Sequence, residues 1–305
     1  MFSGSSVALV TPMSADGTVD FACLERLVDL HVTEGTDCLV ITGTTGESAT
    51  LSKSEHIEVI RVAAERAAGR IPVVAGTGSN STAQTIELSR AVAAYPIDGY
   101  LIVTPYYNKP TQEGLCRHYL AIADAVDRPV ILYNVPGRTG VDMLPEAVAK
   151  VAKHSGIAGI KEATGDLSRV ATLRAGCGDE FVLLSGDDAT AREFILKGGQ
   201  GVISVTANVA PALMAGMCEA ALEGDDVLAA ELDARLADLH RDLFVESNPI
   251  PVKWALERLG LIPGGLRLPL TPLSVLARPV VEAALRQAGL LEALPGDRAF
   301  AGGHR

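Results

Sequence analysis

One lysine stands where a buried strand should end. Residues 157–160 form a short apolar run, typical of a strand buried on both faces, and Lys161 follows it directly. A lysine amine attacks a carbonyl carbon only in its neutral form, which an apolar surrounding favours over the ammonium. Lys161 is therefore a candidate nucleophile. From its position alone, it could equally extend its ammonium to the surface.

Polar side chains also follow other predicted strands. Gly43–Glu47 (GTTGE) follows the second strand, Pro105–Asn108 (PYYN) follows the fourth, and the fifth ends in Tyr133–Arg138 (YNVPGR). In a parallel barrel the carboxyl ends of the strands meet on one face, so these groups would gather around Lys161. Tyr133 and Lys161 are each the fifth residue of neighbouring strands, so a phenol should lie close enough to exchange protons with an imine nitrogen. This clustering favours catalysis by Lys161.

Each companion of the lysine has two interpretations. Thr44 and Thr45 are either turn hydroxyls or, with the glycine amides beside them, a cradle for a carboxylate. Tyr106 and Tyr107 are either core or interface aromatics, or part of the site. Arg138 is either a solvated loop residue or a bidentate clamp for a carboxylate.

Composition and charge exclude several classes of function. The 305 residues carry a net charge of −11, which argues against nucleic acid and anionic membranes as partners. The start of the chain lacks a signal-peptide pattern, no apolar run could span a membrane, and the five scattered cysteines are typical of a reduced, cytoplasmic protein. No histidine pair has metal-ligand spacing, so we expect no metal and no cofactor, with a lysine imine as the electron sink.

Phosphate is a poor candidate for the substrate. The sequence has no G-K-[ST] loop, and Gly186-Asp187-Asp188 after the seventh strand would repel an anion. The residues therefore predict a lysine-imine enzyme that acts on a small, unphosphorylated keto acid.

Short β-branched runs alternate with helical patterns along most of the chain, with 20 to 34 residues between successive strand starts. The predicted strands are Val7–Thr11, Cys38–Thr42, Pro72–Gly76, Gly99–Thr104, Pro129–Asn134, Ile157–Glu162, Phe181–Ser185 and Gly201–Val205. This alternation predicts a (β/α)8 TIM barrel, an α/β fold, with an open doubly wound sheet as the alternative. We expect the barrel with the active site over residues 1–224, a C-terminal helical domain over 225–294, and a loose tail at 295–305.

Four motifs resemble those of the dihydrodipicolinate synthase (4-hydroxy-tetrahydrodipicolinate synthase) family, one of the pyruvate-dependent class I aldolases related to N-acetylneuraminate lyase. They are GTTGES at 43–48, TPYYNKPTQEG at 104–114, YNVPGRTG at 133–140 and GIKEATGD at 159–166. LLSGDD, GVISVTANVAP and NPIPVKWAL extend the resemblance from Met1 to about Leu291. Arg138 and the Tyr106-Tyr107-Asn108 run favour the synthases over the neuraminate-type lyases.

The resemblance implies a role for each site residue. Lys161 would form a Schiff base with pyruvate, and the derived enamine would attack the aldehyde of L-aspartate-β-semialdehyde. Tyr133 would be the central proton shuttle, completed by Thr44 and by Tyr107, which in this family enters from a neighbouring subunit. The substrate-binding residues would be Thr45, the backbone at Ile203, Gly186 and, for the semialdehyde carboxylate, Arg138. The family is typically a homotetramer, a dimer of dimers, in bacterial lysine and diaminopimelate biosynthesis.

The resemblance also implies a regulatory site for L-lysine, from which this chain departs at two positions. Residues that match the site are Ser48, Ala49, His56, Asn80 and Tyr106. However, Lys53 replaces a histidine that is common in sensitive bacterial enzymes, and Gln84 replaces a glutamate. An added cation and a lost carboxylate should weaken binding of a cationic effector, which predicts weak or absent feedback inhibition.

Two other functions stay open at this stage. A pyruvate-dependent aldolase of sugar acids or hydroxy keto acids would use the same lysine, and differs in the aldehyde that it turns over. A non-catalytic keto-acid binder would form no adduct that borohydride could trap.

Overall fold

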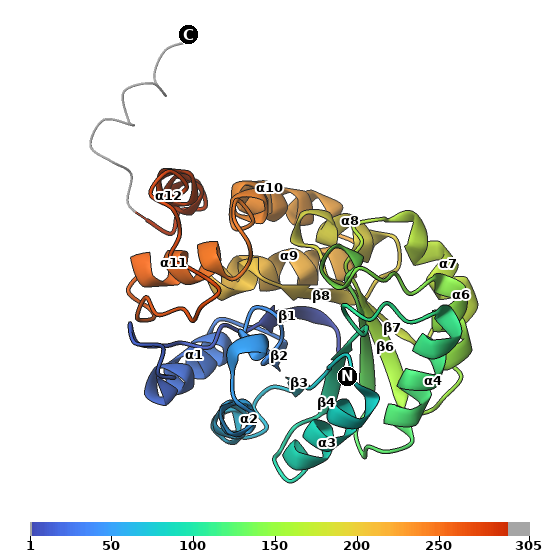
Figure 1. The fold of residues 1–305 in the computed structure, drawn as a ribbon. Coiled ribbons are helices and arrows are strands. Elements are labelled where there is room, and N and C mark those ends of the chain that lie inside the picture. The colour runs from blue at the N-terminus through green and yellow to red at the C-terminus, as the bar shows by residue number, and fades with distance from the viewer. Residues whose placement is uncertain (1, 292–305) are drawn as a thin grey trace.

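The computed structural model describes residues 2–291, so the tail predicted at 295–305 lies outside the described residues. Eight parallel strands close into a barrel in the order β1 to β8, and helices surround it (Figure 1). The strands are β1 (Gly4–Ala8), β2 (Cys38–Ile41), β3 (Val73–Gly76), β4 (Gly99–Val103), β5 (Val130–Asn134), β6 (Ile157–Glu162), β7 (Val182–Ser185) and β8 (Gly201–Ser204). The (β/α)8 barrel is confirmed, and the open sheet is excluded because β1 pairs with β8.

Side chains that alternate along the strands build two cores. One set fills the inside of the barrel and includes Ala8, Val40, Leu101 and Ile131. The other set points outward and packs against the helices, as Val7 and Leu132 do. Because both faces are buried, the strands appear in the sequence as unbroken apolar runs.

The prediction for the first strand was wrong. It placed the strand at Val7–Thr11, whereas Gly4–Ala8 pairs with both neighbours, from Gly4 opposite Gly201 to Ala8 opposite Val40. Leu9 and Val10 are buried, and the Val10 amide donates to Asn208 Oδ1 at 3.1 Å. The apolar run therefore continues into a buried loop, which a strand pattern does not distinguish from the sheet.

The helices follow the strands in the expected order. They are α1 (Phe21–Thr33), α2 (Lys53–Ala67), α3 (Thr82–Val92), α4 (Gln112–Ala123), α5 (Pro136–Thr139), α6 (Pro145–Val151), α7 (Ser168–Cys177), α8 (Ala191–Leu196), α9 (Pro211–Glu223), α10 (Asp226–Asp242), α11 (Ile250–Arg258) and α12 (Arg278–Gln287). Short 3-10 turns lie at η1 (Ser48–Thr50), η2 (Asp188–Thr190) and η3 (Thr206–Asn208). Within residues 2–291, no helix is both long and apolar enough to span a lipid bilayer.

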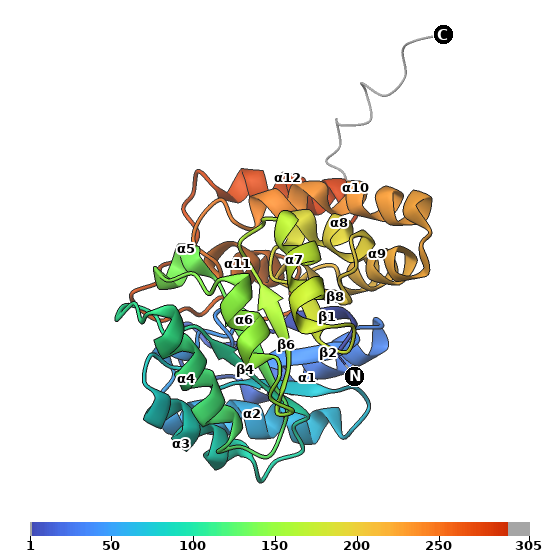
Figure 2. The ribbon, with the colours of Figure 1, turned by 90° about the vertical axis from the view of Figure 1, so that its right-hand side faces the viewer.

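The last three helices lie on the side of the barrel opposite α2 and α3 (Figures 1 and 2). The segment between α11 and α12 nevertheless reaches α2, because the Arg267 guanidinium donates to both carboxylate oxygens of Glu55, at 2.5 and 2.9 Å. The same guanidinium also donates to the carbonyls of Gly17 and Thr50, each at 2.8 Å. The division of the chain after Gly224 stays a prediction.

Replacing Arg267 should destabilise the fold in a pH-dependent way. The hydrogen bonds from Arg267 lower the pKa of Glu55 from 4.5 to about 2, so the ion pair stabilises the fold above pH 4.5 and is lost as the pH falls towards 2. Because both groups are partly exposed, we expect Arg267→Met to lower the free energy of unfolding by about 1–2 kcal/mol at pH 7. Denaturant titrations across this pH range measure the difference.

The matched control is Arg117→Met, because the Arg117–Glu113 pair on α4 is far more exposed. This variant should unfold like the parent protein. A deficit for Arg267→Met that stays constant between pH 7 and pH 2 would contradict the assignment.

Candidate active site

Lys161 and Tyr133 lie side by side inside the barrel mouth. The two residues are register partners on β6 and β5, which confirms the prediction of equal depth. Lys161 Nζ lies 4.4 Å from the centroid of the Tyr133 ring, and the residues are only 5% and 7% exposed. Among residues 2–291, no hydrogen-bond or ion-pair partner contacts the Lys161 amine. The amine therefore lies against an aromatic ring and not against a carboxylate.

Two of the predicted substrate-binding residues lie in the barrel, one of them beside this lysine. Gly186 directly follows β7, and a Cβ atom added there would lie 3.0 Å from Lys161 Cε. Ile203 on β8 is 2% exposed and belongs to the same interior cluster as Tyr133. Gly186 therefore leaves the space next to the lysine stem free of a side chain.

A polar network behind the strands, buried at Asn134 and Glu162 and partly exposed at Asp142 and Arg169, fixes the ends of β5 and β6. Asn134 Nδ2 donates to Asp142 Oδ1 at 2.8 Å and to Glu162 Oε2 at 3.3 Å. Arg169 is ion-paired with Asp142 and lies 3.5 Å from Glu162 Oε2. Burial raises the pKa of the Glu162 carboxyl, against the hydrogen bonds that it accepts. Because Asn134 and Glu162 directly follow Tyr133 and Lys161, this network holds the reactive pair in register. The sequence analysis did not predict this network. The signal that could have revealed it is a polar residue at the end of each apolar strand, Asn134 in β5 and Glu162 in β6.

The turn Gly43–Glu47 meets Arg138 through a residue that sequence reasoning did not assign to the site. Asn248 Nδ2 donates to Thr45 Oγ1 at 3.0 Å, and the Arg138 guanidinium donates to the Asn248 carbonyl at 3.3 Å. Asn248 Oδ1 is buried and has no hydrogen-bond partner among the described residues. Thr44 is half-buried beside Thr45. Thr45 and Arg138 are therefore linked through Asn248, a residue of the C-terminal segment.

Tyr107 is not part of this buried cluster within a single chain. Its side chain is 89% exposed, and its φ of 74° is unfavourable for a residue with a side chain. Tyr106 is 41% exposed. Tyr107 is thus the one predicted catalytic residue that the described residues place on the surface, away from Lys161.

The residues of the predicted lysine site lie on adjacent loops and turns. Ser48 and Ala49 are in η1, and His56 is on α2, where its Nε2 lies 2.8 Å from the Gly76 carbonyl oxygen and burial lowers its pKa. Asn80 Nδ2 donates to the Tyr106 carbonyl at 3.2 Å.

The two departures from the lysine-site pattern already have partners. The Lys53 ammonium is ion-paired with Glu87, and Gln84 Oε1 accepts from Ser79 Oγ at 3.0 Å.

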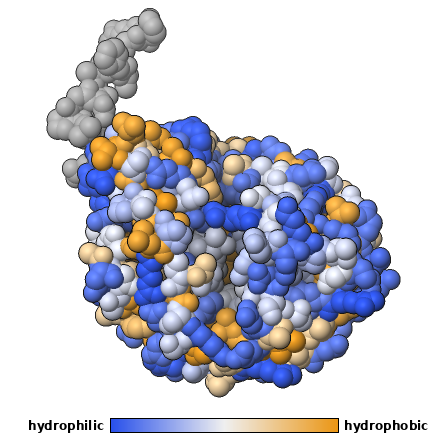
Figure 3. All heavy atoms as spheres, viewed as in Figure 1, coloured by the Kyte–Doolittle hydropathy of each residue, from blue (hydrophilic) through white to orange (hydrophobic). Residues whose placement is uncertain are grey.

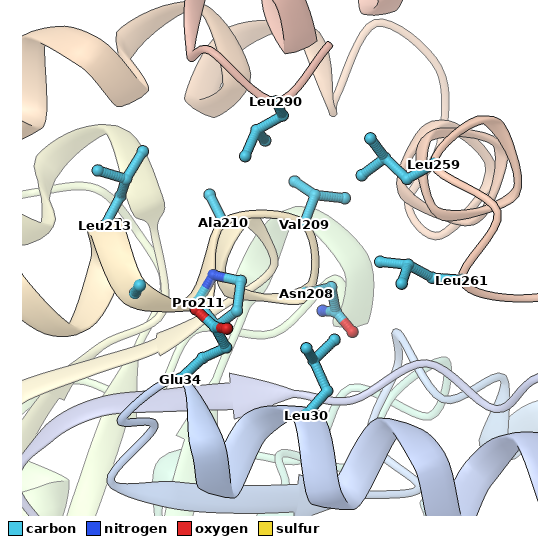
Figure 4. A pocket seen from close by; sticks show the side chains of 11 residues that line it. Leu30, Glu34, Asn208, Val209, Ala210, Pro211, Leu213, Leu259, Leu261 and Leu290 are labelled. Carbon is cyan, nitrogen blue, oxygen red and sulfur yellow. The ribbon is translucent and has the colours of Figure 1, made fainter.

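The barrel face is hollowed near its middle, as the view along the barrel shows (Figure 3). A separate apolar cavity of about 290 Å³ lies outside the barrel and is lined by leucines such as Leu30, Leu213 and Leu259 (Figure 4). The residues that line it include no lysine, cysteine or serine, so the candidate nucleophile remains Lys161 in the barrel.

Within residues 2–291, no group of three or more His, Cys, Asp or Glu side chains is placed to hold a metal ion.

Comparisons with known proteins show which family the chain belongs to. A model of the dihydrodipicolinate synthetase family matches residues 1–288. The chain is 62% identical to the 4-hydroxy-tetrahydrodipicolinate synthase of Methylococcus capsulatus, over 95% of this chain and 100% of the relative. It is 60% identical to that of Alcanivorax borkumensis, over 96% of this chain and 99% of the relative.

A solved structure has the same fold. The chloride-inhibited dihydrodipicolinate synthase of Acinetobacter baumannii, in complex with pyruvate, is 51% identical, and the alignment covers 95% of this chain and 100% of that one with a TM-score of 0.94. The family match and the shared fold both extend over nearly the whole chain. The chain therefore belongs to the dihydrodipicolinate synthase family and is an enzyme, a lyase of the class I aldolase type.

Proposed function

We propose that this enzyme is a 4-hydroxy-tetrahydrodipicolinate synthase, which condenses pyruvate with L-aspartate-β-semialdehyde through a Schiff base on Lys161. The observation that carries the proposal is the buried Lys161 amine, which lacks an ionic partner in the described residues and lies 4.4 Å above the Tyr133 ring. The family membership supports the choice of substrates.

The chemistry starts at the amine. Lys161 Nζ adds to C2 of pyruvate, and the carbinolamine loses water to form the imine. The imine withdraws electrons, so a methyl proton leaves and the resulting enamine attacks the aldehyde carbon of the semialdehyde. The amine of the semialdehyde then attacks the imine carbon, closes the ring and releases Lys161.

Protons must move at each of these steps. Tyr133 is the acid and base nearest the amine, and its phenol takes and returns protons at the carbinolamine and the imine. Thr44 and Tyr107 of a neighbouring subunit would relay these protons to water. The 89% exposure of Tyr107 supports its place in another subunit's site.

Binding follows from the groups around the amine. Thr45 and the adjacent backbone amides hold the pyruvate carboxylate, while the backbone at Gly186 and Ile203 forms the opposite wall. Arg138 binds the carboxylate of the semialdehyde as a fixed fork. The enzyme would act in the cytoplasm as a homotetramer, a dimer of dimers, in lysine and diaminopimelate biosynthesis.

Removal of the amine should abolish covalent capture of pyruvate. Incubation with pyruvate and borohydride should add one reduced pyruvate to the parent chain and none to Lys161→Ala, measured by intact mass. Lys153→Ala, which removes an amine outside the site, is the control and should be trapped like the parent. An adduct on Lys161→Ala, or none on the parent, would contradict the proposal.

A methyl group at Gly186 should disturb the reactive lysine. In Gly186→Ala the new Cβ would lie 2.5 Å from Ala163 Cβ and 3.0 Å from Lys161 Cε. The chain at Ala163 must therefore shift, and we expect the lysine stem two residues before it to be displaced as well. A displacement of this kind costs about 10- to 100-fold in kcat/KM for pyruvate. Steady-state kinetics test this, with Gly216→Ala on α9 as a remote control. A variant with normal kcat/KM would show that the stem is not held here.

Feedback inhibition by L-lysine should be weak. Because Lys53 is already paired with Glu87, the missing carboxylate at Gln84 should matter more than the added cation. We therefore expect Gln84→Glu to increase sensitivity more than Lys53→His, and the double variant to be the most sensitive. Initial rates against L-lysine concentration measure this order. Near-complete inhibition of the parent enzyme at sub-millimolar L-lysine would refute the prediction.

A further inference from the structure

A second buried lysine lies on the C-terminal segment, and it is held quite differently from Lys161. Lys253 on α11 is 1% exposed, and its ammonium forms an ion pair with Glu47, whose side chain is 0% exposed. Lys253 Nζ also donates to the Thr11 carbonyl at 3.0 Å, and Glu47 Oε2 accepts from the Arg267 amide at 3.4 Å. A charge pair this deeply buried loses much solvation, so it is weak support for stability alone.

The turn that carries Glu47 is strained. Thr42 and Glu47 have φ values of 55° and 56°, in the left-handed region that residues with a side chain avoid. Thr44 and Thr45 lie between them. Strain of this kind persists only where the surroundings impose it. Part of the constraint is Thr11 Oγ1, which donates to the Gly46 carbonyl at 2.7 Å.

Lys253 cannot act as a second nucleophile in this arrangement. Burial lowers the pKa of its ammonium, but Glu47 opposes the shift. The ammonium is engaged by Glu47 and the Thr11 carbonyl, and it is sealed from solvent. Its contacts lead to the turn and not to the Lys161 amine.

We propose that Lys253 is a positioning residue, which acts on the reaction through the turn that carries Thr44 and Thr45. This inference rests on the proposed function. The Lys253–Glu47 pair holds the strained turn so that the hydroxyls of Thr44 and Thr45 face pyruvate. The C-terminal segment would thus complete the substrate site of the barrel, because Asn248 of the same segment also binds Thr45.

The experiment compares Lys253→Met with the double variant Lys253→Met/Glu47→Met. The single variant leaves a buried carboxylate unpaired and should lower both Tm and kcat/KM for pyruvate, the latter about 100-fold. The double variant has no unpaired charge, so its Tm should return towards the parent value while kcat/KM stays low. If kcat/KM recovers together with Tm, the pair is merely structural and the proposal is overturned.

Glu47→Gln provides a second test that does not depend on a large change in the core. It keeps the shape and a hydrogen-bonding oxygen but removes the charge, and it should raise KM for pyruvate about 10-fold with a smaller fall in kcat. Parent-like KM and kcat in this variant would overturn the proposal.

The matched control is Arg174→Met, which removes a cation that donates to the carbonyls of Gly178, Phe181 and Gly198 away from the turn. It should lower Tm and leave KM for pyruvate unchanged.

Borohydride trapping of the parent enzyme separates this inference from the proposed function. If the parent forms no pyruvate adduct, the proposed function itself fails. If the parent is trapped at Lys161 and the Lys253 and Glu47 variants keep parent-like kinetics, only the positioning role fails.

Discussion

The proposed chemistry depends on one condition, which is that no charged side chain lies beside the Lys161 amine. Two lysines are buried within residues 2–291, and their neighbours differ. Lys253 is paired with a carboxylate and locks a turn, whereas the amine of Lys161 lies over the face of the Tyr133 ring. Moving a carboxylate next to Lys161 would favour its ammonium and suppress its reactivity. The barrel keeps carboxylates away from this position by directing Glu162, the next residue, outward.

Polar contacts outside the barrel fix the segments around this arrangement. One polar network holds the ends of β5 and β6 on the side away from the barrel interior, and it consists of Asn134, Asp142, Glu162 and Arg169. Its charged groups are not partners of the Lys161 amine. The C-terminal segment holds the other wall through Asn248 and the turn at Glu47. Both groups contain buried polar contacts, and such contacts are costly to break and leave little freedom to the groups that they fix.

The sequence predicted what depends on local pattern. Strand spacing placed Tyr133 and Lys161 at equal depth, and the alternation of elements predicted the closed barrel. The limits of β1 were wrong because a buried loop is as apolar as a strand. Asn248 and Lys253 were missed as partners of the turn because about two hundred residues separate them from it, and no local pattern records such a contact. Tyr107 was predicted to join the site, but within one chain its side chain is exposed, and a pattern in the sequence does not reveal exposure at a loop.

The most direct test of the central claim is a crystal structure of the enzyme after pyruvate soaking and borohydride reduction. The account predicts continuous density between Lys161 Nζ and C2 of pyruvate, with the carboxylate against Thr45 and with Lys253 unmodified and still paired with Glu47. Density for an adduct on Lys253, or pyruvate bound beside an unmodified Lys161, would contradict it.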